Sequence, residues 1–115
     1  MLGFDLQEVE RIGDEEKLLQ RIALESEIEY IHKFQNSKER VACLWAVKEA
    51  VFKALNSYPD EISYREIELC HKENGSPFVK LYGKARAVFE KNGFTEIEIS
   101  ISHQKSVVGA VVLTK

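Results

Sequence analysis

The sequence predicts an α+β domain in which helices mostly precede antiparallel strands. Three patterns support this fold class: a long apolar helical repeat in the middle of the chain, alternating segments on both sides of Asn74-Gly75, and an almost wholly apolar stretch at 107–113. We therefore expect an antiparallel sheet packed against one long helix and several shorter ones, forming a single domain over residues 1–115.

The first third of the chain predicts one strand and two short helices. Residues 1–6 form a short apolar run typical of a strand, although Gly3 weakens it and the carboxylate of Asp5 interrupts it. Between 14 and 34 apolar residues recur at about helical spacing. Ser26 has the features of a cap, so a second helix is expected to begin there.

The strongest helical pattern follows directly. Asn36 and Glu39 resemble a capping box, and apolar residues continue at helical spacing to Leu55, before the breaker at 56–59. This segment is expected to be the long helix.

The remaining chain alternates between strand and helix patterns. The segments at 66–69 and 78–81 read as two strands joined by the tight turn at Asn74-Gly75. A helix over about 83–91, ended by Asn92-Gly93, leads to an alternating strand at 97–102. The final apolar strand is expected to be central and covered on both faces.

The composition excludes several classes of protein. With 44% hydrophobic and 30% charged residues, the 115-residue chain is typical of a globular protein, and a net charge of -3 argues against broad nucleic-acid binding. Cys43 and Cys70 lack the spacing of a zinc site or a disulfide framework. No stretch approaches a membrane span or a signal peptide, so no membrane association and a cytoplasmic location are expected.

One face of the long helix carries a candidate site. Trp45, Glu49 and Lys53 fall four residues apart and so share a face. Glu49 and Lys53 fit a surface ion pair contributing about 0.3 to 0.5 kcal/mol. They also fit a metal ligand or base beside a phosphate-binding cation, although helical spacing alone favours the ion pair. Spacing does not exclude either interpretation.

Two further places carry polar groups of interest. Asp5 fits either a helix-capping acid at a strand end or a metal ligand, and His103 fits either an inert loop residue or a binding group. Ser100 and Ser102 fit the solvent face of a strand. Two acids, a lysine and a histidine are the ingredients of a magnesium-phosphate site.

Taken in order, these segments resemble the holo-acyl-carrier-protein synthase family, the short trimeric class of 4′-phosphopantetheinyl transferases. The resemblance covers essentially the whole chain. It rests on Gly3-Phe4-Asp5 with the following Glu8–Ile12, on Trp45-Ala46-Val47-Lys48-Glu49-Ala50-Val51-Phe52-Lys53-Ala54, on Asn74-Gly75-Ser76-Pro77, and on Ser100-Ile101-Ser102-His103.

The sequence departs from the family pattern at three positions. Leu44 stands where family members often have arginine, Ser76 where the turn is often basic, and Gln104 where a threonine often follows the histidine. Each departure removes a contact that the family would make to the phosphates of coenzyme A.

The resemblance implies a reaction and a set of roles. The chain would transfer 4′-phosphopantetheine from coenzyme A to a serine of apo-acyl carrier protein for fatty acid synthesis, releasing 3′,5′-ADP and using Mg²⁺. Asp5 and Glu49 would hold the metal, Lys53 would offset phosphate charge, and Glu49 or a metal-bound water would be the base. Family members are homotrimers with active sites between subunits.

The resemblance also implies contacts for both substrates. The acidic carrier protein would meet Arg11, extended by Lys17 and Arg21, although these last two equally fit solvated surface charge. Coenzyme A would contact Lys48, Lys53, Asn74, Gly75, Ser76, Pro77, His103 and Gln104. The sequence allows two other classes of function: a non-catalytic subunit that binds coenzyme A or carrier protein, and a module associated with nucleic acid, against which the acidic net charge argues.

Overall fold

The structure is a computed structural model that describes residues 1–115. It confirms the predicted α+β class, with antiparallel strands and one long helix. The elements in order are β1 (Leu2–Glu8), η1 (Val9–Arg11), α1 (Glu15–Ile22), α2 (Glu25–Ile31), α3 (Ser37–Ala54), η2 (Tyr64–Glu66), β2 (Ile67–His71), β3 (Pro77–Leu81), α4 (Gly83–Lys91), β4 (Ile97–Gln104) and β5 (Val107–Thr114).

The strands form two antiparallel sheets. The larger has the order β1-β5-β4, and the smaller is the β2-β3 hairpin. Asp5 pairs with Ala110, which pairs with Ile101, so these three residues share the inner face of the larger sheet. The last strand is central, as predicted.

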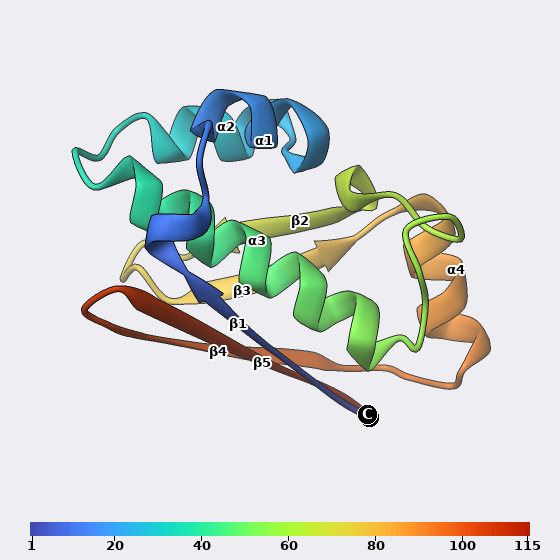
Figure 1. Cartoon of the computed structure of the whole chain (residues 1–115). Coiled ribbons are helices and arrows are strands. Elements are labelled where there is room, and N and C mark those ends of the chain that lie inside the picture. Colours follow the sequence, from blue (N-terminus) through green and yellow to red (C-terminus); the bar gives the residue numbers. More distant parts are fainter.

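The prediction that the last strand is covered on both faces is wrong for this chain. Phe4 pairs with Val111, and both are exposed, at 55% and 37% of their surface. Leu2, Leu6 and Val107 are also exposed along the two strands. The inner face meets α3, whereas the outer face of the sheet has no element of this chain against it (Figure 1).

Close packing of β1 on α3 depends on small residues. Ala46, Ala50 and Ala54 recur every four residues and are fully buried. Gly3 crosses this stripe, and a Cβ there would overlap the Ala50 carbonyl oxygen and lie 2.7 Å from the Ala54 nitrogen. Gly3 therefore lets β1 approach the helix, which fixes Asp5 two residues further along the same face.

The helix α3 lies between the pair α1–α2 and the larger sheet (Figure 1). It contributes to two apolar clusters, one with the sheets and α4 and the other with α1 and α2. The predicted bounds of this helix are close, although the Asn36 side chain bonds Glu39 at 3.0 Å and caps no backbone amide.

The predicted helix start at Ser26 is two residues late. The helix α2 is preceded by Leu24, whose backbone N–H donates to Glu27 Oε1 at 2.8 Å. Ser26 instead donates to Glu68 at 2.7 Å. The predicted stop of α4 is confirmed, because Gly93 has φ +78. No helix in the structure has both the length and the apolar character that a bilayer crossing needs.

Candidate active site

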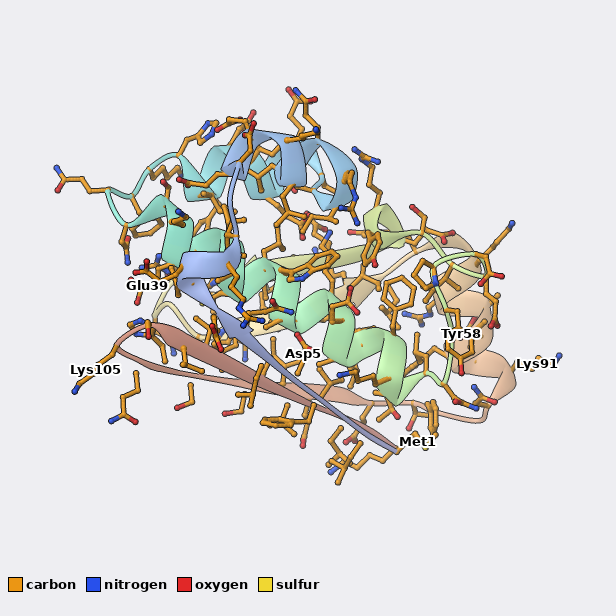
Figure 2. All side chains as sticks on the ribbon, viewed as in Figure 1. Met1, Asp5, Glu39, Tyr58, Lys91 and Lys105 are labelled. Atoms are coloured by element: carbon orange, nitrogen blue, oxygen red, sulfur yellow. The ribbon has the colours of Figure 1, made fainter.

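Asp5 lies in the middle of β1 and caps no helix. It points toward α3, between the strand and the helix (Figure 2), and only 13% of its side chain is exposed. Lys53 Nζ donates to Asp5 Oδ1 at 3.1 Å, and Gln7 Nε2 donates to Oδ2 at 2.7 Å. Both oxygens of this carboxylate are thus oriented by neighbouring donors.

Lys53 and Glu49 share a face of α3 but form no ion pair with each other. Lys53 reaches across to β1 instead, where it also donates to the Phe4 carbonyl at 2.9 Å. Glu49 Oε1 accepts a hydrogen bond of 3.0 Å from the Tyr64 hydroxyl, and Oε2 has no protein donor. The structure therefore does not show the simple surface ion pair, and it brings Asp5, Lys53 and Glu49 onto one side of α3.

The oxygen donors of Asp5 and Glu49 suit a hard divalent cation. Carboxylates are the ligands that Mg²⁺ prefers, and it usually takes only one or two of them beside water and substrate phosphates. No group of three or more His, Cys, Asp or Glu side chains in the structure is arranged to hold a metal. The residues present fit a metal held partly by substrate.

The prediction that Lys48 contacts coenzyme A is wrong. Its side chain is 0% exposed, and Nζ donates to Ile22 O at 2.6 Å, Glu27 Oε1 at 2.7 Å and Tyr64 O at 2.9 Å. All three ammonium donors are used inside the protein. Burial lowers the pKa of Lys48, while Glu27 opposes that shift. Lys48 holds α1, α2 and η2 against α3 and has no surface for a ligand.

The serine-histidine segment splits between the two faces of the sheet. Ser100 and Ser102 lie on the outer face, paired with Val111 and Gly109. His103 lies on the inner face and pairs with Glu39 at the start of α3. Two strand spacings, about 10 Å, separate His103 from the β1 residue in register with it.

Glu39, the partner of His103, lies near the start of α3, apart from Asp5 in the middle of β1 (Figure 2). Ten helical residues, a rise of about 15 Å, separate Glu39 from Glu49. Within one chain the structure thus brings Lys53 against Asp5, places Glu49 one helical turn from Lys53 on the same face of α3, and leaves His103 apart from them.

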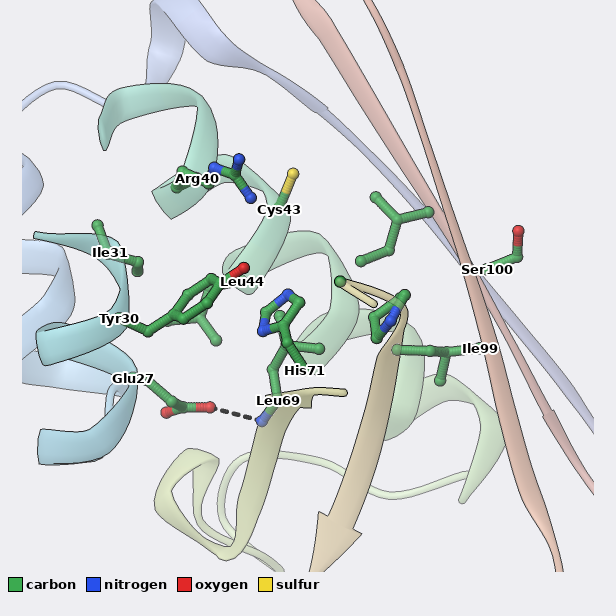
Figure 3. A pocket seen from close by; sticks show the side chains of 13 residues that line it. Glu27, Tyr30, Ile31, Arg40, Cys43, Leu44, Leu69, His71, Ile99 and Ser100 are labelled. Carbon is green, nitrogen blue, oxygen red and sulfur yellow. Dashed lines mark hydrogen bonds between the residues drawn. The ribbon is translucent and has the colours of Figure 1, made fainter. Parts of the chain in front are cut away.

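The Asn-Gly-x-Pro turn borders a pocket of about 320 Å³ between α2, α3, the β2-β3 hairpin and β4. Gly75 and Pro77 line it, together with Tyr30 and His71, whose rings stack at 4.1 Å (Figure 3). The turn itself is closed by Asn74 Oδ1, which accepts from both the amide and the hydroxyl of Ser76, at 3.0 and 2.7 Å.

Arg40 is the only lysine or arginine that lines this pocket. Its guanidinium lies 3.8 Å over the Phe34 ring, and its buried Nε has no hydrogen-bond partner. Burial and this guanidinium lower the pKa of His71, which favours the neutral imidazole. Leu44 also borders the pocket, but it is almost fully buried in the cluster with α1 and α2.

The three cations predicted for the carrier protein are all exposed. Arg11 pairs with Glu8 at 3.1 Å directly after β1. The Arg21 guanidinium lies 5.6 Å from the Trp45 ring centroid, on the α3 face that carries Glu49 and Lys53. Lys17 has no side-chain partner in the chain.

Sequence reasoning missed Gln7 and Tyr64 as parts of the site. Gln7 has a detectable signal, because it is two residues after Asp5 and shares its face of β1. Tyr64 has none, because it lies in a short 3-10 segment with no periodicity. Tyr64 reaches Glu49 only through the folded contacts of its ring with Trp45 and Phe52, at 5.3 and 4.7 Å.

Comparison with known proteins defines the class of this chain. The profile of the 4′-phosphopantetheinyl transferase superfamily matches residues 1–111. A holo-[acyl-carrier-protein] synthase from Caldicellulosiruptor bescii is 38% identical over 117 residues, covering 99% of this chain and 96% of the relative.

Two solved structures agree over nearly the whole chain. The Helicobacter pylori holo-[acyl-carrier-protein] synthase in complex with coenzyme A gives a TM-score of 0.84 at 26% identity, covering 100% of both chains. The Bacillus anthracis synthase in complex with CoA (3′,5′-ADP) gives 0.81 at 27% identity, covering 98% of this chain and 93% of that one. The chain belongs to the holo-[acyl-carrier-protein] synthase family of transferases, as its motifs predicted.

Proposed function

We propose that the chain transfers 4′-phosphopantetheine from coenzyme A to a serine of apo-acyl carrier protein, giving holo-acyl carrier protein and 3′,5′-ADP. The observation that carries the proposal is the contact between Lys53 and Asp5, residues 48 apart in sequence, on the α3 face that also presents Glu49. The two carboxylates suit a divalent cation that binds a diphosphate, and the ammonium of Lys53 suits the phosphate charge.

The reaction forms a bond between the serine oxygen and the β-phosphorus and breaks the bond from that phosphorus to the bridging oxygen of the diphosphate. Negative charge grows on the phosphoryl oxygens and on the leaving phosphate. Lys53 offsets this charge, because its side chain is 53% exposed and its ammonium is held at the site by Asp5. Glu49 would accept the proton of the serine hydroxyl, either directly or through a bound water.

Asp5 and Glu49 would hold Mg²⁺. When bound, the ion would neutralise part of the diphosphate charge and fix its orientation. Lys53 and Gln7 keep the Asp5 carboxylate in place, and the Lys53 bond would have to loosen for that oxygen to coordinate the ion. Hard carboxylate oxygens with few other protein ligands are the support for this assignment.

The nucleotide end of coenzyme A would bind at the pocket beside the Asn74–Pro77 turn. Gly75 and Pro77 line it, and Arg40 supplies a positive charge with an unpaired Nε. In this chain Arg40, one helical turn before Leu44, would replace the phosphate contact that Leu44 lacks.

We further propose a homotrimer built on the outer face of the larger sheet. Phe4, Leu6, Val107 and Val111 line a shallow hollow there, together with Gln104 and Lys105 from the β4–β5 end. An exposed apolar surface of this kind is typical of an interface. The β4 end that carries His103 would then lie at the boundary with a neighbouring copy and complete its phosphate site.

Size-exclusion chromatography with light scattering tests the assembly. A trimer would give three times the 13.2 kDa mass of the chain. The variant Phe4→Glu should lower that mass, because a charge on the apolar face is costly to bury. A wild-type protein that elutes as a monomer would contradict the trimer.

Mass spectrometry of the carrier protein tests the function directly. Purified chain, apo-acyl carrier protein, coenzyme A and Mg²⁺ are mixed, and the carrier should gain the mass of one phosphopantetheine arm. The Asp5→Asn variant should leave the carrier unmodified while keeping the thermal unfolding temperature of the wild type. A wild-type reaction with no mass gain, despite binding of coenzyme A, would favour a non-catalytic binding subunit.

A further inference from the structure

Tyr64 is held by three sets of contacts, two of which involve the consecutive α3 residues Lys48 and Glu49. Its hydroxyl donates to Glu49 Oε1 at 3.0 Å, and its carbonyl accepts from Lys48 Nζ at 2.9 Å. Its ring lies against Trp45 and Phe52, with centroids 5.3 and 4.7 Å apart. A side chain fixed by its backbone, ring and hydroxyl is well placed to orient another group.

The contact leaves the two oxygens of Glu49 in different states. Oε1 is bound to the phenol, whereas Oε2 has no protein donor. Glu49 is half-buried on a helix face, where a free glutamate would sample several rotamers. The Tyr64 hydroxyl therefore selects the rotamers of Glu49 that keep Oε1 at the phenol, and it leaves Oε2 for a ligand.

We propose that Tyr64 is a positioning residue, which orients Glu49 so that its second oxygen binds the divalent cation used in the transfer. This inference rests on the proposed function. The phenol suits the role, because its O–H donates to the Glu49 carboxylate while its ring and backbone are held by other contacts.

The contact with Lys48 connects Tyr64 to the buried core of the protein. The Lys48 ammonium holds the Tyr64 carbonyl and is itself paired with buried Glu27 at 2.7 Å. Tyr64, which orients Glu49, is thus anchored by Lys48, the buried residue directly before Glu49 in the sequence. The position of the Glu49 carboxylate therefore depends on the packing of Lys48 and Glu27 on the buried side of α3.

The test removes only the hydroxyl. Tyr64→Phe keeps the ring between Trp45 and Phe52, so the fold should persist. Tyr82→Phe is the matched control, because its hydroxyl donates to the Glu68 carboxylate at 2.6 Å on another part of the surface. Both variants lose one phenol-to-carboxylate hydrogen bond.

Two readouts report on the cation. The first is direct titration with Mn²⁺ in the presence of coenzyme A, following free Mn²⁺ by electron paramagnetic resonance. The second is the Mg²⁺ concentration that gives half the maximal rate of carrier modification. Tyr64→Phe should weaken both by about 10-fold or more. Tyr82→Phe should match the wild type in both.

The outcomes separate this inference from the proposed function. If the wild type modifies the carrier and Tyr64→Phe binds Mn²⁺ as tightly as the wild type, or more tightly, the positioning role is overturned alone. If the wild type leaves the carrier mass unchanged, the proposed function and the inference fall together. An equal loss in Tyr82→Phe would also overturn the role, since it would assign the effect to a general change in the protein.

Discussion

Lys48 and Lys53 lie five residues apart on the same helix, yet they serve opposite sides of it. Lys48 is fully buried, and its ammonium is satisfied by Glu27 and two carbonyl groups. Lys53 is half-exposed and bonds Asp5 and one carbonyl at the surface. The same side-chain chemistry therefore has a structural use where it is enclosed and a chemical use where solvent and substrate can reach it.

The neighbouring carboxylates show the same contrast. Glu27 is buried and accepts from Leu24 N, Leu69 N and Lys48 Nζ, so its hydrogen-bonding capacity is used by the protein. Glu49 has one oxygen bound and one free. On the buried side of α3 the protein itself satisfies the charged groups. On the exposed side, Glu49 keeps one oxygen that can accept a metal ion or a proton.

The largest effect is expected from Glu49→Gln. Loss of the charge removes both the proton acceptor and a metal ligand, so the rate of carrier modification should fall by about 10²- to 10⁴-fold. The free energy of unfolding should change by less than about 1 kcal/mol, because Glu49 is not enclosed. The exposed Glu90, paired with Arg86 in α4, provides the control Glu90→Gln. A Glu49→Gln enzyme with near wild-type turnover would contradict the functional role that separates Glu49 from the buried Glu27.

The variant Lys48→Met should affect stability instead. It leaves the Glu27 carboxylate buried without its cation, which is expected to lower the free energy of unfolding by about 3–5 kcal/mol. Urea titration measures the change, and the double variant Lys48→Met with Glu27→Gln should recover part of it. A single variant as stable as the wild type would contradict the structural role of Lys48.

Lys53→Ala gives the matched result for the open side. The rate of carrier modification should fall by about 10²-fold, because one group that stabilises the transition-state charge is lost. Stability should change by less than about 1 kcal/mol, since the Asp5 ion pair is solvent-accessible on the lysine side. Lys91→Ala, in the last turn of α4, is the control. An effect of Lys53→Ala on thermal stability alone would leave Lys53 with only a structural role, through its contact with Asp5.

The smallest effect concerns Cys43, which lies on α3 beside the pocket. Burial raises the pKa of its thiol from 9.0 to about 11. Between these values the unfolded chain loses the proton first, so stability should fall as pH rises from 9 to 11. Cys43→Ala should make the decline of the urea midpoint between pH 8.5 and 10.5 shallower. An unchanged pH slope would show that this thiol stays exposed in solution.

Sequence patterns located most elements because each rests on local physics. The long helix, the turn at Asn74-Gly75 and the stop at Gly93 depend on spacing, capping and backbone conformation within a few residues. Asp5 stood out because a carboxylate interrupts an apolar strand. Its contact with Lys53 lies beyond local pattern, since only the approach of Gly3 to α3 creates it.

Two errors also have physical causes. The motif around Glu49 predicts a surface role for Lys48, yet Lys48 shares helical spacing with Leu44 and Leu55, which are both buried, and this spacing indicates the buried face of the helix. The apolar character of the last strand predicts that both of its faces are covered, but a sequence does not say whether its own chain or another copy provides the cover.

Anomalous scattering from crystals grown with coenzyme A and Mn²⁺ would test the central claim most directly. That claim is that the open side of α3 and β1 together hold one divalent cation through Asp5 and Glu49. The account predicts a single peak in coordination range of an oxygen from each carboxylate, at about 2.0–2.5 Å. A peak that contacts neither residue, with coenzyme A bound, would contradict it.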